Sequence, residues 1–216
     1  LCDGNSAVFR DLLPALDISA DRFLRTSSAE HRRSAERFWR SCRPRDIELR
    51  DYHGRYCTGC EDFYLERDLV DGRCPVHGTE PHSVSERNYF FRLSAYQHVL
   101  DRLIATGEIR VRPEARRNEV LAFIRRGLRD FSISRDRQRT GGWGVPVPGD
   151  PSQVLYVWFD ALINYLTGVD WPDGERFATF WPVAWHLIAK DILKPHAIFW
   201  PTMLQAAGLP VYEHLN

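Results

Sequence analysis

Four residues with the spacing of metal ligands lie between positions 57 and 77. Cys57 and Cys60 form a C-x2-C pair, and Cys74 and His77 form a C-x2-H pair after thirteen intervening residues. Three thiolates and one imidazole in this pattern fill the four tetrahedral positions of zinc and leave none open, which predicts a structural rather than a catalytic metal. The surrounding knuckle, about residues 50–82, has little core of its own, so the metal is expected to hold it folded.

A second stretch that could carry chemistry runs from Trp185 to Pro201. It begins with apolar residues, turns at Ala189, Lys190 and Asp191, and continues with apolar residues at helical spacing, which predicts a strand followed by a helix. In an open α/β sheet, ligands bind at the carboxyl ends of strands, where such turns lie. The alternative is a buried strand and helix with an aromatic helix face.

The elements that must position these residues can be predicted from hydrophobic periodicity. Before residue 150 we expect a helix within 5–24, a second helix from a Ser27–Glu30 capping box to about Arg40, an aromatic strand within 85–94, a helix to about Thr106 and another from Pro113. The Gly/Pro-rich passage 141–151 is a plausible domain boundary.

Beyond residue 150 the pattern changes to strand–helix units. The apolar run Val154–Phe159 predicts a buried strand, and residues 160–166 predict a helix after it. Together with the stretch from Trp185, these are two consecutive strand–helix units, which indicate part of a parallel sheet. Two strands are too few for a doubly wound domain, so we expect residues outside this sequence to complete the sheet.

Composition excludes several classes of protein. The chain has 216 residues, 44% of them hydrophobic, and zero formal net charge, so no global field favours nucleic acid or a membrane surface. No apolar run approaches the roughly 20 residues that span a bilayer, and the first residues do not resemble a signal peptide. Five cysteines, three of them clustered, favour an intracellular metalloprotein, and a cytoplasmic location is expected.

Several motifs, in order and spacing, resemble the methionyl-tRNA synthetase family. They are NYFFRLS at 88–94, SISR at 132–135, VPVPGD at 145–150, YVWFDALINY at 156–165 and AKDILKPH at 189–196, together with the zinc knuckle. The resemblance covers nearly the whole chain. It implies an α/β fold, with a partial Rossmann-type parallel sheet of the class I aminoacyl-tRNA synthetase kind in residues 151–216. Residues 1–150 would be a helical connective insertion that bears the zinc knuckle.

The resemblance also implies where ligands bind. The amino-acid pocket would consist of Trp158, Ala161, Leu162, Tyr165, Ile192, His196, Phe199 and Trp200. Arg135, Ala189 and Asp191 would lie next to ATP, with Asp191 near the ribose. A thioether favours polarizable aromatic walls, and a Tyr–His pair could supply the orienting polar contacts. The resemblance assigns none of these residues a catalytic role.

By resemblance, the reaction is ATP-dependent activation of methionine and its transfer to tRNA, with ATP and magnesium as substrates. The family's His-x-Gly-His and Lys-Met-Ser-Lys-Ser signatures do not occur in this sequence. These groups stabilise the charge that develops on the α-phosphate. We therefore expect this chain alone not to complete the reaction. A complementary catalytic half on another chain is a possible partner, and tRNA would bind only where the remaining domains are present.

Two other functions stay open. Leu162, Ala189 and Pro195 differ from the family's usual residues at the pocket or the nucleotide edge. They favour a paralogue that activates or joins a different amino acid in small-molecule biosynthesis, without tRNA. The third possibility is a degenerate zinc-bearing module that binds a partner protein. A thermal-shift screen of all amino acids tests the paralogue, and a pull-down tests the binding module.

Overall fold

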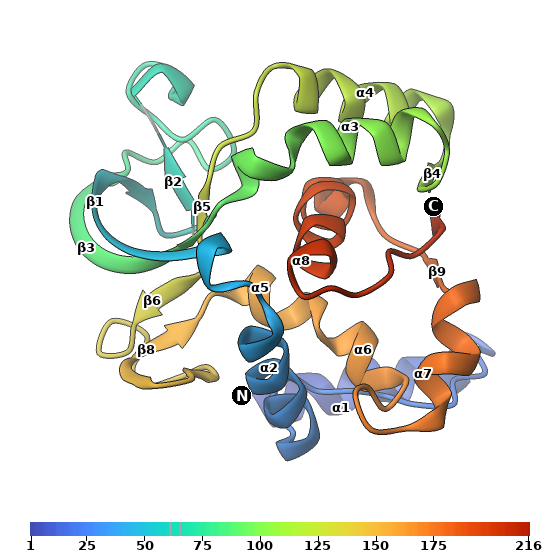
Figure 1. The fold of residues 1–216 in the computed structure, drawn as a ribbon. Coiled ribbons are helices and arrows are strands. Elements are labelled where there is room, and N and C mark those ends of the chain that lie inside the picture. The colour runs from blue at the N-terminus through green and yellow to red at the C-terminus, as the bar shows by residue number, and fades with distance from the viewer. Residues whose placement is uncertain (61, 65) are drawn as a thin grey trace.

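The chain folds into an α/β arrangement in which helices surround small sheets (Figure 1). The structure, a computed structural model, describes residues 1–60, 62–64 and 66–216. The helices are α1 (Cys2–Ala15), α2 (Ala29–Ser41), α3 (Gln97–Ala105), α4 (Glu114–Arg125), α5 (Val157–Leu162), α6 (Asn164–Gly168), α7 (Glu175–Phe180) and α8 (Trp200–Ala206). The strands are β1 (Ile47–Cys57), β2 (Asp62–Tyr64), β3 (His82–Phe91), β4 (Arg110–Val111), β5 (Phe131–Ser132), β6 (Ser134–Asp136), β7 (Pro146–Val147), β8 (Asp150–Leu155), β9 (Trp185–His186) and β10 (His214–Leu215).

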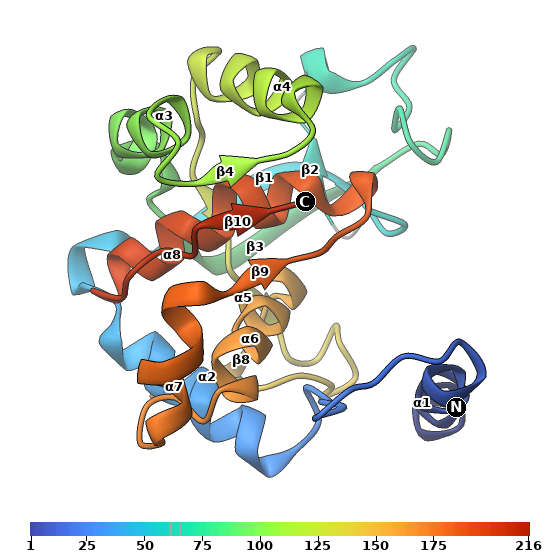
Figure 2. The same ribbon diagram turned by 90° about the vertical axis from the view of Figure 1, so that its right-hand side faces the viewer.

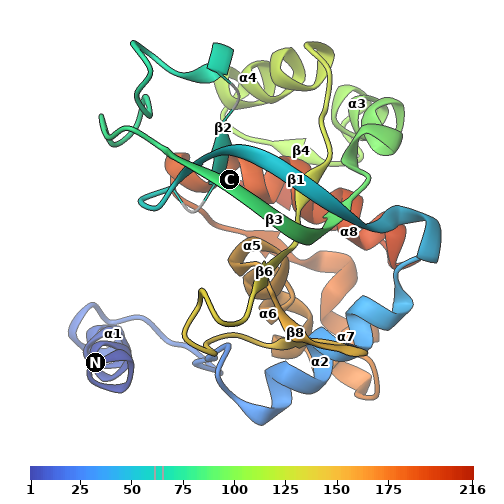
Figure 3. The ribbon, with the colours of Figure 1, turned by 90° about the vertical axis from the view of Figure 1, so that its left-hand side faces the viewer.

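A long antiparallel ribbon carries the predicted metal ligands. β1 and β3 pair from Ile47 opposite Phe91 to Tyr56 opposite His82, and β2 and β5 extend the sheet to the order β2-β1-β3-β5. Figure 3 shows this ribbon passing above the β6 and β8 strands. The ribbon therefore holds the knuckle at one end, while its other end, near Phe91, enters the core.

A continuous hydrophobic core joins segments from before and after residue 150. In Figure 1, α8 lies between the α3–α4 pair and the α5–α6 segment. The ring of Phe38 on α2 lies 5.8 Å from that of Phe159 on α5 and 5.9 Å from that of Trp200 on α8. All three side chains are fully excluded from solvent. Residues on both sides of position 150 share this core, so the domain boundary near residue 150 stays a prediction.

The parallel sheet predicted by the sequence is present, but only one of the two predicted strands, the one that begins at Trp185, belongs to it. β9 and β4 both pair in parallel with β10, which gives the order β4-β10-β9. β8 instead pairs antiparallel with β6 and β7. The α/β class with a parallel sheet is thus confirmed. The prediction that the strands of the two consecutive strand–helix units lie in one parallel sheet is wrong, because β8 belongs to a separate antiparallel sheet.

The predicted strand Val154–Phe159 is wrong over its second half. β8 ends at Leu155, Tyr156 caps the next element with an extended backbone, and α5 begins at Val157. Phe159 and Leu162, three positions apart, are buried while Val157 is exposed, which is the pattern of one helix face. A continuous apolar run does not distinguish a strand from a buried helix, and this run contains both.

The first two helices differ in detail from the prediction. The N-cap of α2 is Ser28 rather than Ser27, because the Ser28 hydroxyl accepts the His31 backbone N–H at 3.1 Å. The first helix runs from residue 2 to 15, not through residue 24, and has no buried residue. It stands apart from the other helices in Figures 2 and 3. Among the described residues, none of the helices combines the length and apolar character of a membrane span.

Candidate functional site

A tyrosine–histidine pair lies at the centre of the predicted amino-acid site. The Tyr165 hydroxyl lies 2.8 Å from Nε2 of His196, and His196 Nδ1 lies 2.9 Å from the Ile192 carbonyl. A carbonyl can only accept, so Nδ1 carries the proton and Nε2 accepts the hydrogen bond from Tyr165. Burial lowers the pKa of His196 and raises that of Tyr165, which keeps both groups neutral. The pair is an uncharged polar contact within an apolar region.

The backbone places His196 in a turn of π-helix, residues 195–199, ahead of α8. The backbone N–H of Trp200 donates to the Pro195 carbonyl and so closes the wider i to i+5 ring. Tyr212 holds this turn from the other side, because its buried hydroxyl donates to the His196 carbonyl at 2.6 Å. π-helical turns inside helices frequently occur at functional sites.

A second buried histidine, His186 on β9, belongs to the same cluster. Its Nε2 accepts the indole N–H of Trp200 at 2.9 Å, and its ring stacks on Tyr165 with centroids 4.2 Å apart. Burial, and then the proximity of the second titratable ring, His196, lowers the pKa of His186 to about 4. The ring centroids of the two histidines lie 6.4 Å apart. The sequence prediction missed His186 and Tyr212 as site residues, because neither belongs to a spaced motif.

The other predicted pocket residues lie around this cluster at different depths. Trp158 is half-buried, and its ring makes a T-shaped contact with the ring of His196, with centroids 6.3 Å apart. Ala161 and Ile192 are also half-buried, whereas Leu162 is buried in the core. Trp200 is fully buried, and Phe199 stacks on Phe131 with centroids 4.0 Å apart. The structure therefore brings Trp158, Tyr165, His196 and Trp200 together directly.

The residues predicted to lie next to ATP occupy two different places. Ala189 and Asp191 are exposed in the segment after β9, where residues 190–192 form a single 3-10 turn. Arg135 on β6 is buried, donates to the Ser132 hydroxyl at 2.9 Å, and lies over the Tyr156 ring at 4.1 Å. A buried guanidinium held in this way is a fixed positive charge rather than a mobile side chain.

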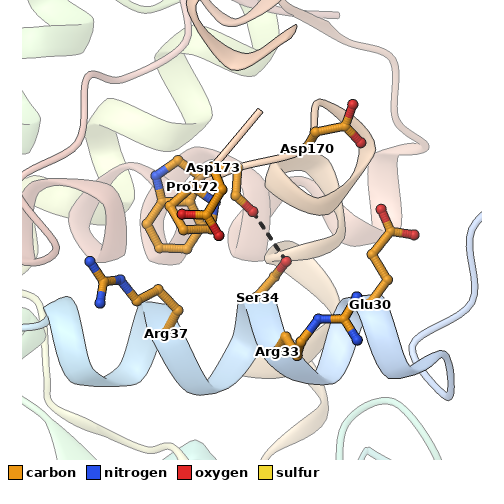
Figure 4. A pocket seen from close by; sticks show the side chains of 8 residues that line it. Glu30, Arg33, Ser34, Arg37, Asp170, Pro172 and Asp173 are labelled. Carbon is orange, nitrogen blue, oxygen red and sulfur yellow. Dashed lines mark hydrogen bonds between the residues drawn. The ribbon is translucent and has the colours of Figure 1, made fainter. Parts of the chain in front are cut away.

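A separate hollow of about 330 Å³ opens between α2 and the turn at residues 170–173 (Figure 4). Arg33 and Arg37 on α2 lie opposite Asp170 and Asp173 of the turn in this view. Because both charge signs line the hollow, it has no evident preference for an anion or a cation. No predicted pocket residue lines it.

The four predicted metal ligands converge. One ligand atom from each of Cys57, Cys60, Cys74 and His77 lies within 4.8 Å of all the others. The Cys60 and Cys74 sulfurs are 3.5 Å apart, and His77 Nδ1 lies 3.1 to 3.8 Å from the three sulfurs. Tetrahedral zinc, with Zn–S bonds of about 2.3 Å, requires ligand separations of about 3.5 to 3.8 Å. The donor set and its spacing therefore fit a metal such as zinc.

Local geometry explains why the knuckle closes. Gly59 lies between the first two cysteines, and a Cβ at this position would meet ring atoms of His77 at 2.8 Å. The backbone N–H of His77 in turn donates to the Cys74 sulfur at 3.4 Å. Residues 61 and 65 of the predicted 50–82 knuckle lie outside the described residues.

Comparison with known proteins assigns this architecture to a family. The family described as "tRNA synthetases class I (M)" matches residues 1–82 and 65–216. The methionine–tRNA ligase of Thermosynechococcus vestitus is 47% identical over 99% of this chain, which covers 41% of that protein. The chloroplastic/mitochondrial methionine–tRNA ligase of Arabidopsis thaliana is 43% identical over 96% of the chain and 34% of that protein. The chain thus spans about two fifths or less of the length of these relatives.

Solved structures agree with the sequence comparison. Mycobacterium tuberculosis methionyl-tRNA synthetase bound by methionyl-adenylate superposes with a TM-score of 0.91 at 42% identity, over 99% of this chain and 43% of that one. The free form of the same enzyme superposes with a TM-score of 0.88, over 99% of this chain and 44% of that one. From its motifs, its metal-ligand cluster and these matches, the chain belongs to the methionyl-tRNA synthetase family of class I tRNA synthetases.

Proposed function

We propose that this chain supplies the methionine-binding and zinc-bearing part of a methionyl-tRNA synthetase. The hydrogen bond of 2.8 Å between the Tyr165 hydroxyl and His196 Nε2, beside Trp158 and Trp200, supports this most directly. The complex of the Mycobacterium tuberculosis relative with methionyl-adenylate agrees with it. The full reaction, with ATP, magnesium and tRNA, needs groups beyond those found in these residues.

The proposed selectivity rests on neutral, polarizable surroundings. A thioether gains from contact with aromatic ring edges and faces, which the half-buried Trp158 would offer, while the fully buried Trp200 packs behind Tyr165. Because His196 stays neutral, a charged side chain of a competing amino acid would lose its hydration without gaining an opposite charge. Tyr165 and His196 would orient the ligand, while Ala161, Leu162, Ile192 and Phe199 would shape the wall.

Titration of this chain with a sulfamoyl analogue of methionyl-adenylate, and separately with methionine, tests the proposal. Tyr165→Phe removes one hydrogen bond and is expected to weaken binding about tenfold. Trp158→Ala, at a half-buried position, is expected to abolish binding without unfolding. Tyr89→Phe is the matched control, because that hydroxyl contacts Asp150 at 3.3 Å instead. Tighter binding of another amino acid would contradict the proposal and favour the paralogue.

ATP is proposed to approach from the side of Ala189 and Asp191, with Arg135 as the fixed positive charge on the other side. The boundary near residue 150, between insertion and catalytic segment, is part of the same proposal. A cytoplasmic location also stays a proposal, since one relative is named as chloroplastic/mitochondrial. If ATP and the analogue share this edge, saturating ATP should weaken the apparent affinity of the chain for the analogue.

We propose that zinc is the metal and that its role is structural. Support comes from the closed set of three sulfurs and one nitrogen, which leaves no position for substrate. Metal analysis of the purified chain should return one equivalent of zinc, and Cys57→Ser should unfold the knuckle while the buried core persists. Well under half an equivalent would contradict the zinc assignment.

We also propose that further synthetase residues dock against β9. β9 is an edge strand of the parallel sheet, and the neighbouring side chains of Trp185 and Leu187 are 61% and 78% exposed. Unpaired edges with apolar side chains readily accept another strand. Co-expression with the unmatched residues of the Thermosynechococcus vestitus relative should yield a complex. Leu187→Glu should abolish the complex, whereas the control Val76→Glu, on the knuckle, should not.

A further inference from the structure

A tyrosine outside the ligand set contacts the predicted metal centre. The hydroxyl of Tyr64 on β2 lies 3.2 Å from the sulfur of Cys60. The other donors described at the sulfurs are more distant, with the His77 backbone N–H 3.4 Å from Cys74 and the Thr79 hydroxyl 3.9 Å from Cys57. Tyr64 therefore makes the shortest described contact from a donor outside the four ligand residues.

The ligand that Tyr64 contacts is the most vulnerable of the three sulfurs. Cys57 and Cys74 are each 1% exposed, whereas Cys60 is only half-buried. A zinc ion with three thiolates and a neutral imidazole carries a net charge of minus one. A hydrogen bond to a thiolate spreads that charge, and a ring beside the sulfur limits access of water and of competing chelators.

The direction of the hydrogen bond between Tyr64 and Cys60 follows from the chemistry of the two atoms. A thiolate can only accept, so the phenol must be the donor. Pairing of β1 with β2 fixes the direction of the contact, since it sets Arg55 opposite Tyr64 and Cys57 opposite Asp62.

We propose that Tyr64 is a positioning residue for the zinc site, whose phenol donates to the Cys60 thiolate and slows release of the metal. The proposal rests on the zinc assignment above. It goes beyond the four ligands, because Tyr64 has no part in the C-x2-C and C-x2-H spacing. Tyr64 belongs to β2, the short strand that follows the first cysteine pair. β2 would therefore cover the metal on the side of Cys60, the most exposed of the three sulfurs.

Zinc release from the whole chain to a chromogenic chelator tests this inference. Tyr64→Phe keeps the ring and removes only the donor, and zinc release is expected to become about tenfold faster. Tyr89→Phe is the matched control, because it also removes a tyrosine hydroxyl that donates a hydrogen bond, in this case to the Asp150 carboxylate. Tyr89 pairs with Leu49, which lies about 25 Å along β1 from Cys57. The control should release zinc at the wild-type rate.

Cobalt substitution supplies a readout that a purely structural effect would not change. In the cobalt protein, loss of the O–H donor should shift the thiolate-to-metal charge-transfer band to lower energy in Tyr64→Phe, with no shift in Tyr89→Phe. One equivalent of zinc in wild type and variant, with release rates within twofold of each other, overturns the role of Tyr64 alone. Less than half an equivalent in the wild type overturns the zinc site and this role together.

Discussion

The contact between His31 and Asp160 permits a quantitative prediction about how the site helix is held. His31 on α2 is fully buried, and its Nε2 lies 2.8 Å from the Asp160 carboxylate on α5. Its Nδ1 lies 3.2 Å from the Thr167 hydroxyl. The carboxylate only accepts, so Nε2 donates, and the two bonds tie α2 to the helices that carry Trp158 and Tyr165.

The burial of His31 and Asp160 sets the expected loss of unfolding free energy when either side chain is removed. Removal of His31 leaves the Asp160 side chain, which is 13% exposed, without its donor and leaves a cavity in the core. A buried acceptor that loses its donor costs about 1–3 kcal/mol of unfolding free energy, and more when the acceptor is a carboxylate. For the pair itself, hydrogen bonds to charged groups indicate a coupling free energy of about 1.5–3 kcal/mol.

A double-mutant cycle of His31→Ala and Asp160→Asn, followed by urea unfolding with zinc held constant, measures the coupling. Arg125 and Asp101 form the matched control, because their side chains also lie 2.8 Å apart but are 60% and 32% exposed. That exposed pair should couple by less than about 1 kcal/mol. Equal coupling in the two pairs would refute the claim that burial makes the His31–Asp160 contact strong.

Two further measurements address the buried histidine and the knuckle. The pKa of His186 falls from 6.5 to about 4 on folding. Its neutral ring therefore contributes about 3 kcal/mol of unfolding free energy above pH 6.5, and this contribution is lost as the pH falls from 6.5 through 4. Urea midpoints of His186→Gln should therefore decline less between pH 7 and pH 4.5 than wild type, and parallel declines would contradict this. Gly59→Ala forces a Cβ to within 2.8 Å of the His77 ring and should lower zinc affinity about tenfold in competition titrations, whereas Gly4→Ala, with open space around it, should not.

The part of the site that could be predicted from sequence consists of residues close together along the chain. Cys57, Cys60, Cys74 and His77 lie on two short turns, and their spacing alone indicates a group that could hold a metal ion. Tyr165 and His196 could be named only through family resemblance, since nothing in their spacing predicts the contact between them.

Contacts between distant segments could not be predicted at all. His31 and Asp160 are separated by 129 positions. His186 accepts a hydrogen bond from Trp200, and it is placed to do so by β9, a strand of only two residues. Neither contact follows a period that a pattern could reveal. The contact between Tyr64 and Cys60 could not be predicted either, because it depends on the pairing of β2 with β1 rather than on the ligand motif.

Local covalent spacing and periodicity are properties of the chain alone, which is why the candidate metal-ligand cluster, the helix from Pro113 and the α/β class follow from the amino-acid order. Packing is a property of the whole molecule. The apolar run Val154–Phe159 suits a strand or a buried helix equally, and the choice depends on which neighbours exclude water from it. Folding placed Phe159 against Phe38 and Trp39, and that burial made the second half of the run a helix.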